Sequence, residues 1–403
     1  MKRVLIPSNN FDFVANLAIG YRSLGFDAIG GQVNFELETG DFDVIHIQWP
    51  EEFTDWRAPT PAQIDAILVR LDRWATRSRL IMSVHNLYPH RYHKNPCFHR
   101  LYTGFYTRAE VIHHFSHVSK ELVCSEYPSI SKRNHVVRLG FNYERLLPSS
   151  PRDRGAARRA FGFAADEIVF LVFGTLRFWE EVRLLRLAFH RARIPNKRLL
   201  LTADYVESGP RWRQRWRRWQ WQRWRRSYGV RSVFERVPDE ELPNLFDASD
   251  AVVVVRQNSM SSGVPSMAMT FGGFVIAPNV GAIPEYLAGT DNALYDQASA
   301  NDLARAMERA AVANRERVGG ENARIAAGWG WEAIVRACLD ALPPRAIVRR
   351  QGESKTQNSG GSPENQLEQI DPFAPATPLS GRSERKPAVA FGLSADDDRG
   401  NDC

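Results

Sequence analysis

The stretch "SSGVPSMAMTFGGFVIAPNVGAIPEYL", from Ser261 to Leu287, decides the fold. Small residues open a helical pattern, "GVPSMAMTFG", at residues 263–272. The apolar run "FVIAP" at 274–278 has the length and composition of a buried strand, and "GAIPE" at 281–285 begins the next helix. A strand enclosed between two helices is the repeating unit of a parallel sheet with crossover helices.

The same alternation extends through the rest of the chain. Strand-like runs precede the stretch and alternate with helical patterns: "AVVVV" (251–255), "SVFERV" (232–237), "KRLLLTA" (197–203), "EIVFLVFG" (167–174), "LIMSVHNL" (80–87), "FDVIHIQW" (42–49) and "RVLIP" (3–7). One helix is predicted from Thr60, a suitable N-cap before Pro61 at the first helical position. Its apolar residues Ile64, Ile67, Leu68 and Leu71 share one face.

A polar, proline-containing stretch, "LLPSSPRDRG" at 146–155, divides this alternation into two parts. We therefore predict an α/β protein with two doubly wound Rossmann-like domains, residues 1–147 and 157–328, and a ligand cleft between them. From about residue 346 to 403 the composition turns polar and rich in Gly, Ser and Pro, which predicts a disordered C-terminal tail.

Composition excludes several classes of protein. The chain has 403 residues, 43% of them hydrophobic, with no apolar run near the ~20 residues that span a bilayer. The N-terminal stretch "MKRVLIPSNN" does not have the pattern of a secretory signal, so we expect none. The scattered Cys97, Cys124, Cys338 and Cys403 suit a reduced cytosol. No metal site is expected either. In "HHFSH", the neighbours His113 and His114 should point to opposite faces of a strand.

Three segments of the second half resemble the GT-B glycosyltransferases, and most closely family 4, the bacterial polysaccharide type. These segments are "FGTLRFWEEVRLLRLAF" (173–189), "VPDEELPNLFDASDAVVVV" (237–255) and the stretch from Ser261 to Leu287. In the first half, "IHIQWPEEF" and "SVHNLYPH" resemble the strand ends of the acceptor domain, and "WGWEAIVRACLDAL" resembles a helix that crosses back onto it. The resemblance implies an acceptor-side domain at 1–147, a nucleotide-sugar domain at 157–328 and a crossover helix within 329–345.

The implied activity is transfer of a hexose from a nucleotide sugar to a glycan or lipid-linked acceptor, without a metal or other cofactor. Several donor-site positions differ from the family pattern. Glu180 stands where a lysine is expected, Ser259 and Met267 replace two glutamates, and Leu139 replaces a histidine. The alternative reading is therefore a catalytically inactive GT-B homologue that binds glycan or acts as a scaffold in polysaccharide assembly.

The candidate donor-binding residues lie in the second domain: Arg177, Ser261, Ser262, Gly263, Gly281 and Glu285. Arginine and a helix N-terminus can stabilise a leaving diphosphate, and Glu285 can accept hydrogen bonds from a sugar or ribose hydroxyl. Each also has a structural reading, since serines cap helices and a first-turn glutamate favours the helix dipole.

The candidate residues of the first domain follow two strands. We predict catalytic roles for His85 and Glu51, and acceptor-binding roles for His46, Trp49 and Asn86. A histidine at the cleft can hydrogen-bond a sugar hydroxyl or exchange a proton near neutral pH, and tryptophan can form a platform for a sugar ring. The structural alternatives are a satisfied strand-end histidine, a buried aromatic residue and a solvated acid.

The stretch "RWRQRWRRWQWQRWRR", from Arg211 to Arg226, holds five tryptophans and eight arginines. Its charge exceeds the chain's net charge of +7, so the rest of the chain is close to neutral. As a crossover helix, it should bury the stripe of Trp212, Trp216 and Trp219 on its sheet. The residues left to meet an anionic membrane would be Arg217, Arg218, Trp221, Arg223, Trp224 and Arg225.

These features predict a cytoplasmic protein that is peripheral at the inner face of the membrane. Nucleic acid also binds arginine and aromatic side chains, but it is the less favoured partner because no other basic face is visible. A surface helix without any partner is the third reading.

Overall fold

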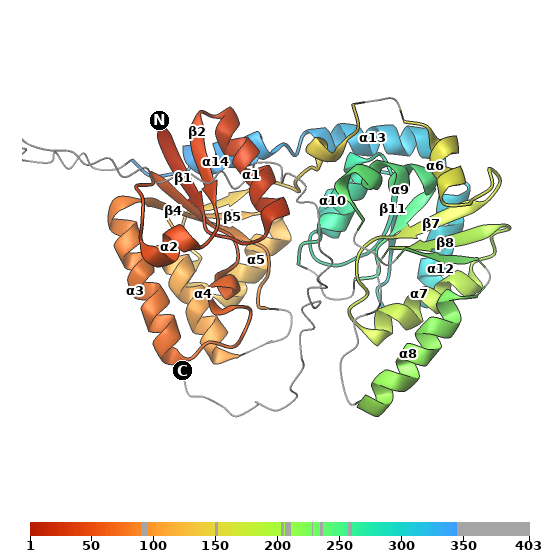
Figure 1. The fold of residues 1–403 in the computed structure, drawn as a ribbon, viewed down its shortest axis with the longest axis horizontal. Coiled ribbons are helices and arrows are strands. Elements are labelled where there is room, and N and C mark those ends of the chain that lie inside the picture. The colour runs from red at the N-terminus through yellow and green to blue at the C-terminus, as the bar shows by residue number, and fades with distance from the viewer. Residues whose placement is uncertain are drawn as a thin grey trace, which may run out of the picture.

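The computed structural model describes residues 1–89, 95–149, 152–202, 205, 211–227, 229–233, 237–256 and 260–344. These residues form two α/β domains, which lie side by side in Figure 1. The predicted fold class is confirmed. The predicted tail at 346–403 lies outside the described residues.

The first domain is a parallel sheet of six strands in the order β2-β1-β3-β4-β5-β6. Its elements are β1 (Lys2–Ile6), α1 (Phe11–Ser23), β2 (Phe26–Gly30), α2 (Val33–Leu37), β3 (Val44–Ile47), η1 (Pro50–Thr54), α3 (Pro61–Arg77), β4 (Arg79–Val84), α4 (Pro96–Arg108), β5 (Val111–His114), α5 (His117–Glu126), η2 (Pro128–Ile130), β6 (His135–Val137) and η3 (Glu144–Leu146). Helices α3 and α4 cover one face of the sheet and α1 covers the other.

The second domain has a matching parallel sheet in the order β12-β11-β10-β7-β8-β9. Its elements are α6 (Arg154–Ala160), β7 (Ile168–Val172), α7 (Trp179–Arg191), β8 (Lys197–Leu201), α8 (Arg211–Arg225), β9 (Val230–Ser232), η4 (Asp239–Glu241), α9 (Leu242–Ala248), β10 (Ala251–Val253), α10 (Gly263–Thr270), β11 (Phe274–Pro278), α11 (Ile283–Tyr286), β12 (Ala293–Tyr295), α12 (Ala300–Ala311) and α13 (Arg315–Ala327). Helices α7, α8 and α12 pack on one face, and α9, α10 and α13 on the other.

Local sequence signals set several of these boundaries. Thr60 caps α3 with a full capping box to Gln63. Of the predicted apolar face, Ile64, Ile67 and Leu71 are buried and Leu68 is half-buried. The quoted helix and strand of the opening stretch are α10 and β11. The strand predicted at 232–237 is displaced: β9 ends at Ser232, and residues 234–236 lie outside the described part.

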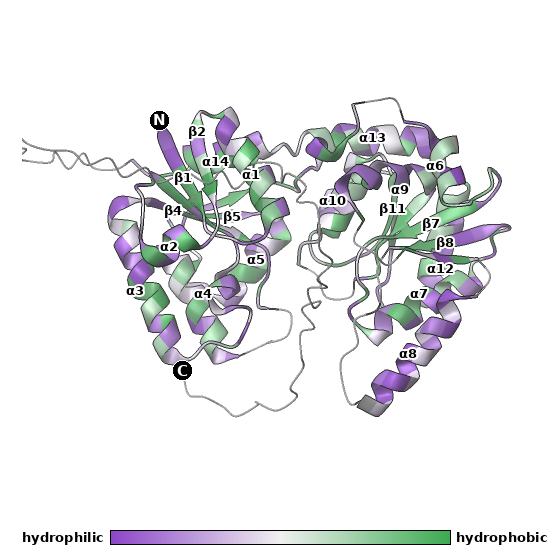
Figure 2. Ribbon diagram, viewed as in Figure 1, coloured by the Kyte–Doolittle hydropathy of each residue, from purple (hydrophilic) through white to green (hydrophobic). Residues whose placement is uncertain are grey.

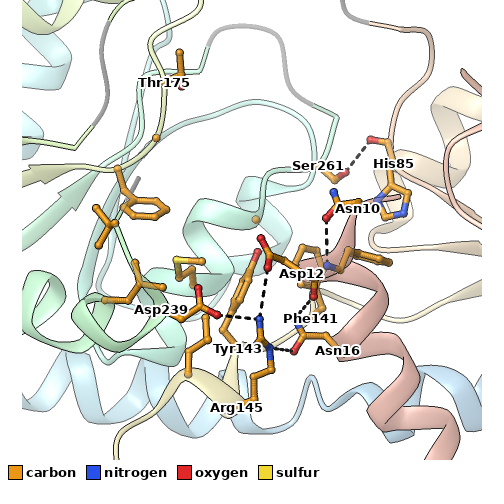
Figure 3. A pocket seen from close by; sticks show the side chains of 18 of the residues that line it. Asn10, Asp12, Asn16, His85, Phe141, Tyr143, Arg145, Thr175, Asp239 and Ser261 are labelled. Atoms are coloured by element: carbon orange, nitrogen blue, oxygen red, sulfur yellow. Dashed lines mark hydrogen bonds and ion pairs between the residues drawn. The ribbon is translucent and has the colours of Figure 1, made fainter. Parts of the chain in front are cut away.

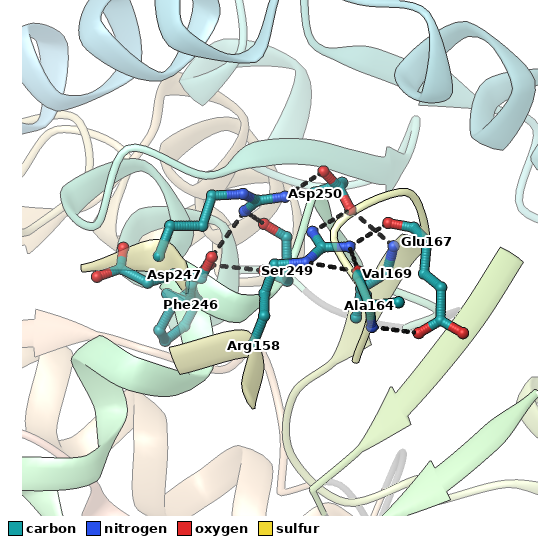
Figure 4. Close-up of polar contacts among 9 residues, drawn as sticks. Arg158, Ala164, Glu167, Val169, Phe246, Asp247, Ser249 and Asp250 are labelled. Carbon is teal, nitrogen blue, oxygen red and sulfur yellow. Dashed lines mark hydrogen bonds and ion pairs between the residues drawn. The ribbon is translucent and has the colours of Figure 1, made fainter. Parts of the chain in front are cut away.

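An ion-pair network fixes α6 and β10 against β7 (Figure 4). The carboxylate of Asp250, just before β10, accepts a hydrogen bond from the backbone N–H of Val169 in β7 at 2.7 Å. The same carboxylate pairs with Arg154 and with Arg158, whose side chain is buried. Because the arginines are paired and hydrogen-bonded, their burial is tolerated, and the register between β7 and β10 is held at its amino-terminal edge.

The last described helix, α14 (Trp331–Asp340), leaves the second domain and packs on α1 of the first. Gly20 of α1 makes this close approach possible, since a Cβ at Gly20 would lie 2.6 Å from the carbonyl oxygen of Trp331. The indole of Trp331 also donates to the carbonyl oxygen of Asn142 at 2.8 Å.

Hydropathy follows this layering, with the strands hydrophobic and the outer helix faces polar (Figure 2). Helix α8 is the exception, because it is hydrophilic along nearly its whole length. In the described part of the chain, no helix combines the length and the apolar character needed to cross a membrane.

Candidate functional site

A cavity of about 860 Å³ lies between the two domains (Figure 3). Its lining includes Asn10, Trp49 and His85 from loops of the first domain, and Gly174, Thr175 and Ser261 from the second. The volume falls in the range of small-molecule sites. The predicted interdomain cleft is therefore present.

The strand order explains why the cavity lies there. In the second sheet, successive strands run outward from β7 through β8 in one direction and from β10 through β11 in the other. The order reverses between β7 and β10, and ligands of doubly wound sheets bind beyond the carboxyl ends of the strands at such a reversal. The first sheet reverses in the same way between β1 and β3, and Asn10 and Trp49 follow these two strands.

Two arginines meet at the reversal in the second sheet. Arg177 follows β7 and lines the cleft, as predicted from its position in the sequence. Arg256 follows β10 and lies against the turn at Gly174, where a Cβ would be 3.8 Å from its Nη2. Burial, followed by the positive charge of Arg177, lowers the pKa of Arg256 to about 10. Its Nη1 is buried and has no hydrogen-bond partner among the described residues.

One buried carboxylate, that of Glu181 in α7, accompanies these arginines. Its Oε2 accepts hydrogen bonds from the backbone N–H groups of Arg177 at 2.7 Å and Phe178 at 3.3 Å, while its Oε1 has no partner among the described residues. Glu181 opposes the lowering of both arginine pKa values, but burial dominates for each. Two cations thus have one acid near them, Arg177 in the lining of the cleft and Arg256 in a small adjoining void that Gly174 and Thr175 also line. An anion at this end of the cleft would offset the excess positive charge.

The start of α10 carries the predicted serines, but their hydroxyls are already used. Ser262 is the N-cap and accepts from Val264 N–H. Ser261 donates across the cleft to the carbonyl oxygen of His85 at 3.0 Å (Figure 3). Gly263 also lines the cleft, and a Cβ there would lie 2.5 Å from the hydroxyl of Tyr143. A side chain at position 263 would therefore force the ring of Tyr143 to move.

The predicted donor-hydroxyl role of Glu285 does not agree with its contacts. Its two carboxylate oxygens accept hydrogen bonds from the backbone N–H groups of His117 and Val118, at 2.8 and 2.7 Å. These N–H groups belong to the first turn of α5, so Glu285 of the second domain caps a helix of the first. Gly281 has φ of +55° in the preceding turn, and neither residue lines the cleft.

His85 lies at the cleft, stacked on Trp49 with ring centroids 4.1 Å apart (Figure 3). Its Nε2 is 3.0 Å from Oε1 of Gln48, so Nε2–H donates and Nδ1 is left as an acceptor. Burial, followed by the charge of His113, lowers the pKa of His85 to about 3. Of the two predicted uses, hydrogen bonding to a substrate hydroxyl fits this environment, and proton exchange near neutral pH does not.

Two other predicted residues of the first domain are buried below the cleft rather than in it. His46 has no exposed surface and contacts the hydroxyls of Tyr21 and Ser83, each at 2.9 Å. Glu51 is equally buried and accepts hydrogen bonds from Tyr102 and Asn86. The structure therefore does not bring the predicted acceptor residue His46 or the predicted catalytic residue Glu51 to the cleft. Asn86 and Trp49 do line the cleft.

The pKa of Glu51 is raised to about 7, mainly by burial, and its hydrogen bonds only partly offset this. Such a carboxyl group has no route to a ligand here, so the shift concerns stability.

The predicted orientation of the tryptophans in α8 is reversed in the structure. Trp221 is 2% exposed and packs with Tyr205 and Trp224 against the second domain. Trp212, Trp216 and Trp219 point outward, with 67%, 56% and 59% of their surface exposed. Trp221 and Trp224 are therefore removed from the predicted membrane-binding set, whereas Arg218 and Arg223 remain exposed and Arg217 and Arg225 are half-buried.

The sequence prediction missed Arg256. The only signal was a single arginine at the end of the apolar run "AVVVVR", and strand ends facing a cleft are where such a residue can meet a ligand. Of the positions that differ from the family pattern, Met267 lines the cleft, Glu180 is exposed at the start of α7, and Ser259 lies outside the described residues.

Comparison with known proteins agrees with this geometry. No protein-family model matches the chain. The D-inositol 3-phosphate glycosyltransferase of Actinosynnema mirum is 29% identical over 210 residues, which are 50% of this chain and 50% of that protein. The chain thus matches about half the length of this curated relative.

Solved structures extend the likeness over most of the chain. Sucrose-phosphate synthase from Thermosynechococcus elongatus has a TM-score of 0.63 at 16% identity, covering 83% of this chain and 97% of that one. Anabaena HepE, solved in complex with UDP, has a TM-score of 0.61 at 16% identity and covers 85% and 100%. A glycosyltransferase from Rickettsia africae gives 0.59 at 13% identity, covering 84% and 97%. The two reversed sheets, the cleft between them and the helix that returns to the first domain are therefore the fold of the GT-B glycosyltransferases.

Proposed function

We propose that the protein is a glycosyltransferase that moves a hexose from a nucleotide sugar to a glycan or lipid-linked acceptor, without a metal ion. The observation that carries this proposal is the pair Arg177 and Arg256 at the strand reversal, with one buried acid between two cations. The negative charge of a nucleotide-sugar diphosphate would balance the excess positive charge of such a site. The likeness to HepE, which was solved with UDP and with glucose, supports the same ligand class.

The chemistry asks the protein to stabilise charge on a leaving group. As the bond between the sugar carbon and the diphosphate oxygen breaks, negative charge grows on the diphosphate. The acceptor hydroxyl forms the new bond to the sugar carbon and loses its proton, which an oxygen of the leaving diphosphate can accept. Arg177, Arg256 and the N-terminal turn of α10 would stabilise that charge, and preorganised donors of this kind contribute most of the effect in many enzymes. Guanidinium groups take the place that a metal ion has in other phosphate sites.

The first domain supplies contacts to the sugar and the acceptor. Nδ1 of His85 can accept a hydrogen bond from a sugar hydroxyl, and Trp49 backs the imidazole and holds its plane. Asn86 reaches the cleft from the same loop. We place the protein in polysaccharide assembly, on the cytoplasmic side of the membrane, where a lipid-linked acceptor would be presented.

The first prediction concerns nucleotide binding by the full chain. UDP, ADP or GDP should raise the melting temperature, because a ligand that binds only the folded state stabilises it by mass action. The rise in melting temperature should persist in excess EDTA. The matching nucleosides, which lack the diphosphate, should raise the melting temperature much less. The measurement is a thermal-shift series over nucleotide concentration. If no nucleotide in the series has any effect, the non-catalytic, glycan-binding reading replaces this one.

A second prediction concerns His85. The variant His85→Ala should lower turnover by about 10-fold, since a hydrogen bond is worth roughly 0.5–1.5 kcal/mol and 1.4 kcal/mol corresponds to a factor of about ten. Because the pKa of His85 is lowered to about 3, the rate of the wild type should show no His85 ionisation between pH 5 and 8. The exposed His190 provides the control variant His190→Ala. An unchanged turnover in His85→Ala, with UDP binding intact, would assign His85 a purely structural role.

A further inference from the structure

Helix α8 presents an unusual outer face, which we call the tryptophan face. It consists of Trp212, Trp216 and Trp219, with the exposed Arg215 and Arg223 between them. The three indoles are four and three residues apart, so they form one stripe along successive turns. Each is more than half exposed, although tryptophan in a monomeric surface helix is normally covered.

The opposite side of α8 explains why this face cannot turn inward. Trp221 and Trp224 fill the space against Tyr205, and Trp221 is among the largest fully buried side chains of the protein. The phase of the helix is therefore fixed by core packing. The exposure of the other three tryptophans follows from that phase, and they contribute little to the core of the second domain.

The charge around the tryptophan face has one sign. Helix α8 contains no acidic residue, and its arginines surround the indoles on both sides. Arg213 and Arg223 lie 5.0 and 5.9 Å from the ring centroids of Trp212 and Trp219. A surface of this kind complements a negatively charged partner, and the indoles suit a partner that is polar at its surface and apolar just beneath.

A groove of about 450 Å³ between α7 and α8 continues this surface. Trp179 and Trp216 form its aromatic walls, and Arg183, Arg186 and Arg217 reach it, together with the single acid Glu180. The guanidinium of Arg217 lies 5.7 Å from the ring centroid of Trp179. Three cations against one acid give the groove the charge expected of a site for a phosphate headgroup.

The topology places this surface near the cleft. Helix α8 follows β8, and Thr202 directly after β8 lines the cleft between the domains. The first turn of α8 therefore begins from the same edge of the sheet at which the proposed ligands bind. In Figure 1 this end of α8 projects beyond the rest of the second domain.

We propose that the tryptophan face and the adjoining α7–α8 groove dock the protein on an anionic phospholipid bilayer, with the three indoles at the headgroup level and the arginines on lipid phosphates. This inference deepens the membrane association in the proposed function and rests on that part of it. Arginine supplies a salt-sensitive attraction, and the buried indole surface supplies a salt-resistant remainder. A bilayer held here would bring a lipid-linked acceptor to the open edge of the cleft.

The test is co-sedimentation of the full chain with vesicles of phosphatidylglycerol and phosphatidylcholine, and with vesicles of phosphatidylcholine alone, at 0.05 and 0.5 M salt. The charge variant is Arg215→Gln, Arg218→Gln and Arg223→Gln. It should bind anionic vesicles roughly 100-fold more weakly at low salt, at about five-fold per arginine. Its control changes three exposed arginines elsewhere, Arg57, Arg159 and Arg324, to glutamine, which alters the net charge equally.

The aromatic variant is Trp212→Ser, Trp216→Ser and Trp219→Ser. Its affinity for anionic vesicles at high salt should be at least about tenfold lower than that of the wild type. Its control replaces the exposed Val69, Leu122 and Val312 with serine. Because all the altered side chains are exposed, both variants should keep the melting temperature of the wild type and its rise with UDP.

Three outcomes separate the possibilities. If wild type binds anionic vesicles but the variants bind as well as their controls, the assignment to α8 is wrong while membrane association stands. If wild type binds no vesicles, or binds single-stranded oligonucleotides instead, both the assignment and membrane association fall. Nucleotide binding is read separately, so its absence in a protein that binds vesicles through α8 would overturn only the glycosyltransfer proposal.

Discussion

Replacing Arg256 with glutamine should weaken UDP binding by about 10- to 100-fold, which is the usual contribution of a hydrogen bond to a charged group. The physical reason is that Arg256 stands at the strand reversal beside Arg177 and near Gly174, and its buried Nη1 has no hydrogen-bond partner among the described residues. Uridine, which has no phosphate, should bind the variant and the wild type equally. Isothermal titration with both ligands measures the difference.

The melting temperature without ligand distinguishes a ligand-binding arginine from a structural one. A half-buried cation that lacks a partner costs free energy, so Arg256→Gln should melt at the same temperature as the wild type or higher. Arg256→Lys keeps the charge but loses the planar fork, and its affinity should be intermediate. Arg324→Gln, which removes an exposed arginine elsewhere, serves as the control. Equal UDP affinity in Arg256→Gln and wild type would remove Arg256 from the proposed site.

The free energy of unfolding should fall steeply as the pH drops below about 6.5. His46, His85 and His113 are buried, and desolvation lowers the pKa of each to about 3. Between pH 6.5 and 3 the unfolded chain binds protons at these positions and the folded chain does not, so acid favours unfolding. Each such histidine contributes a slope of about 1.4 kcal/mol per pH unit.

Glu51 acts in the opposite direction over part of this range. Its pKa is raised to about 7, so between pH 7 and the ordinary value of 4.5 the folded state holds a proton that the unfolded state has released. Its contribution to stability is therefore present at low pH and is lost as the pH rises through 7. Burial also lowers the pKa of His114 and raises that of Glu52, and these two further groups act in opposite directions. The net slope should therefore be that of about two protons, or roughly 3 kcal/mol per pH unit.

Urea unfolding between pH 5 and 7.5 measures this slope. His113→Asn should reduce it by about one proton, because the side chain at that position no longer titrates. His190→Asn, at an exposed position, should leave it unchanged. A wild-type slope near zero, or an unaltered slope in His113→Asn, would mean that these histidines are protonated in the folded protein.

Much of the fold could be predicted because its signals are local. Strand length, apolar runs and helix caps such as Thr60 identified the alternating elements, and alternation alone implies parallel sheets. The cleft followed from the fold rule that ligands bind beyond strand ends. His85, Trp49 and Arg177 could be placed at the cleft for the same reason, since each lies in the loop that follows a strand.

Other features depend on contacts that a sequence does not display. Glu285 stands in the first turn of α11, and nothing in "GAIPE" shows that its carboxylate reaches helix α5 of the other domain. In α8, both tryptophan stripes have helical spacing, and the larger one was expected in the core. Packing against the core of the second domain sets the helix phase, and it buries Trp221 and partly buries Trp224 instead.

The return of α14 to the first domain affects the order in which the chain can fold during synthesis. The apolar surface of α1 and its sheet is covered only when Trp331 and its neighbours arrive, about 194 residues after the first domain's own strands end. At ribosomal rates of roughly 5 to 20 residues per second, that delay is about 10 to 40 s. The first domain therefore emerges first and is completed last. During this interval its apolar face is exposed and can bind a chaperone.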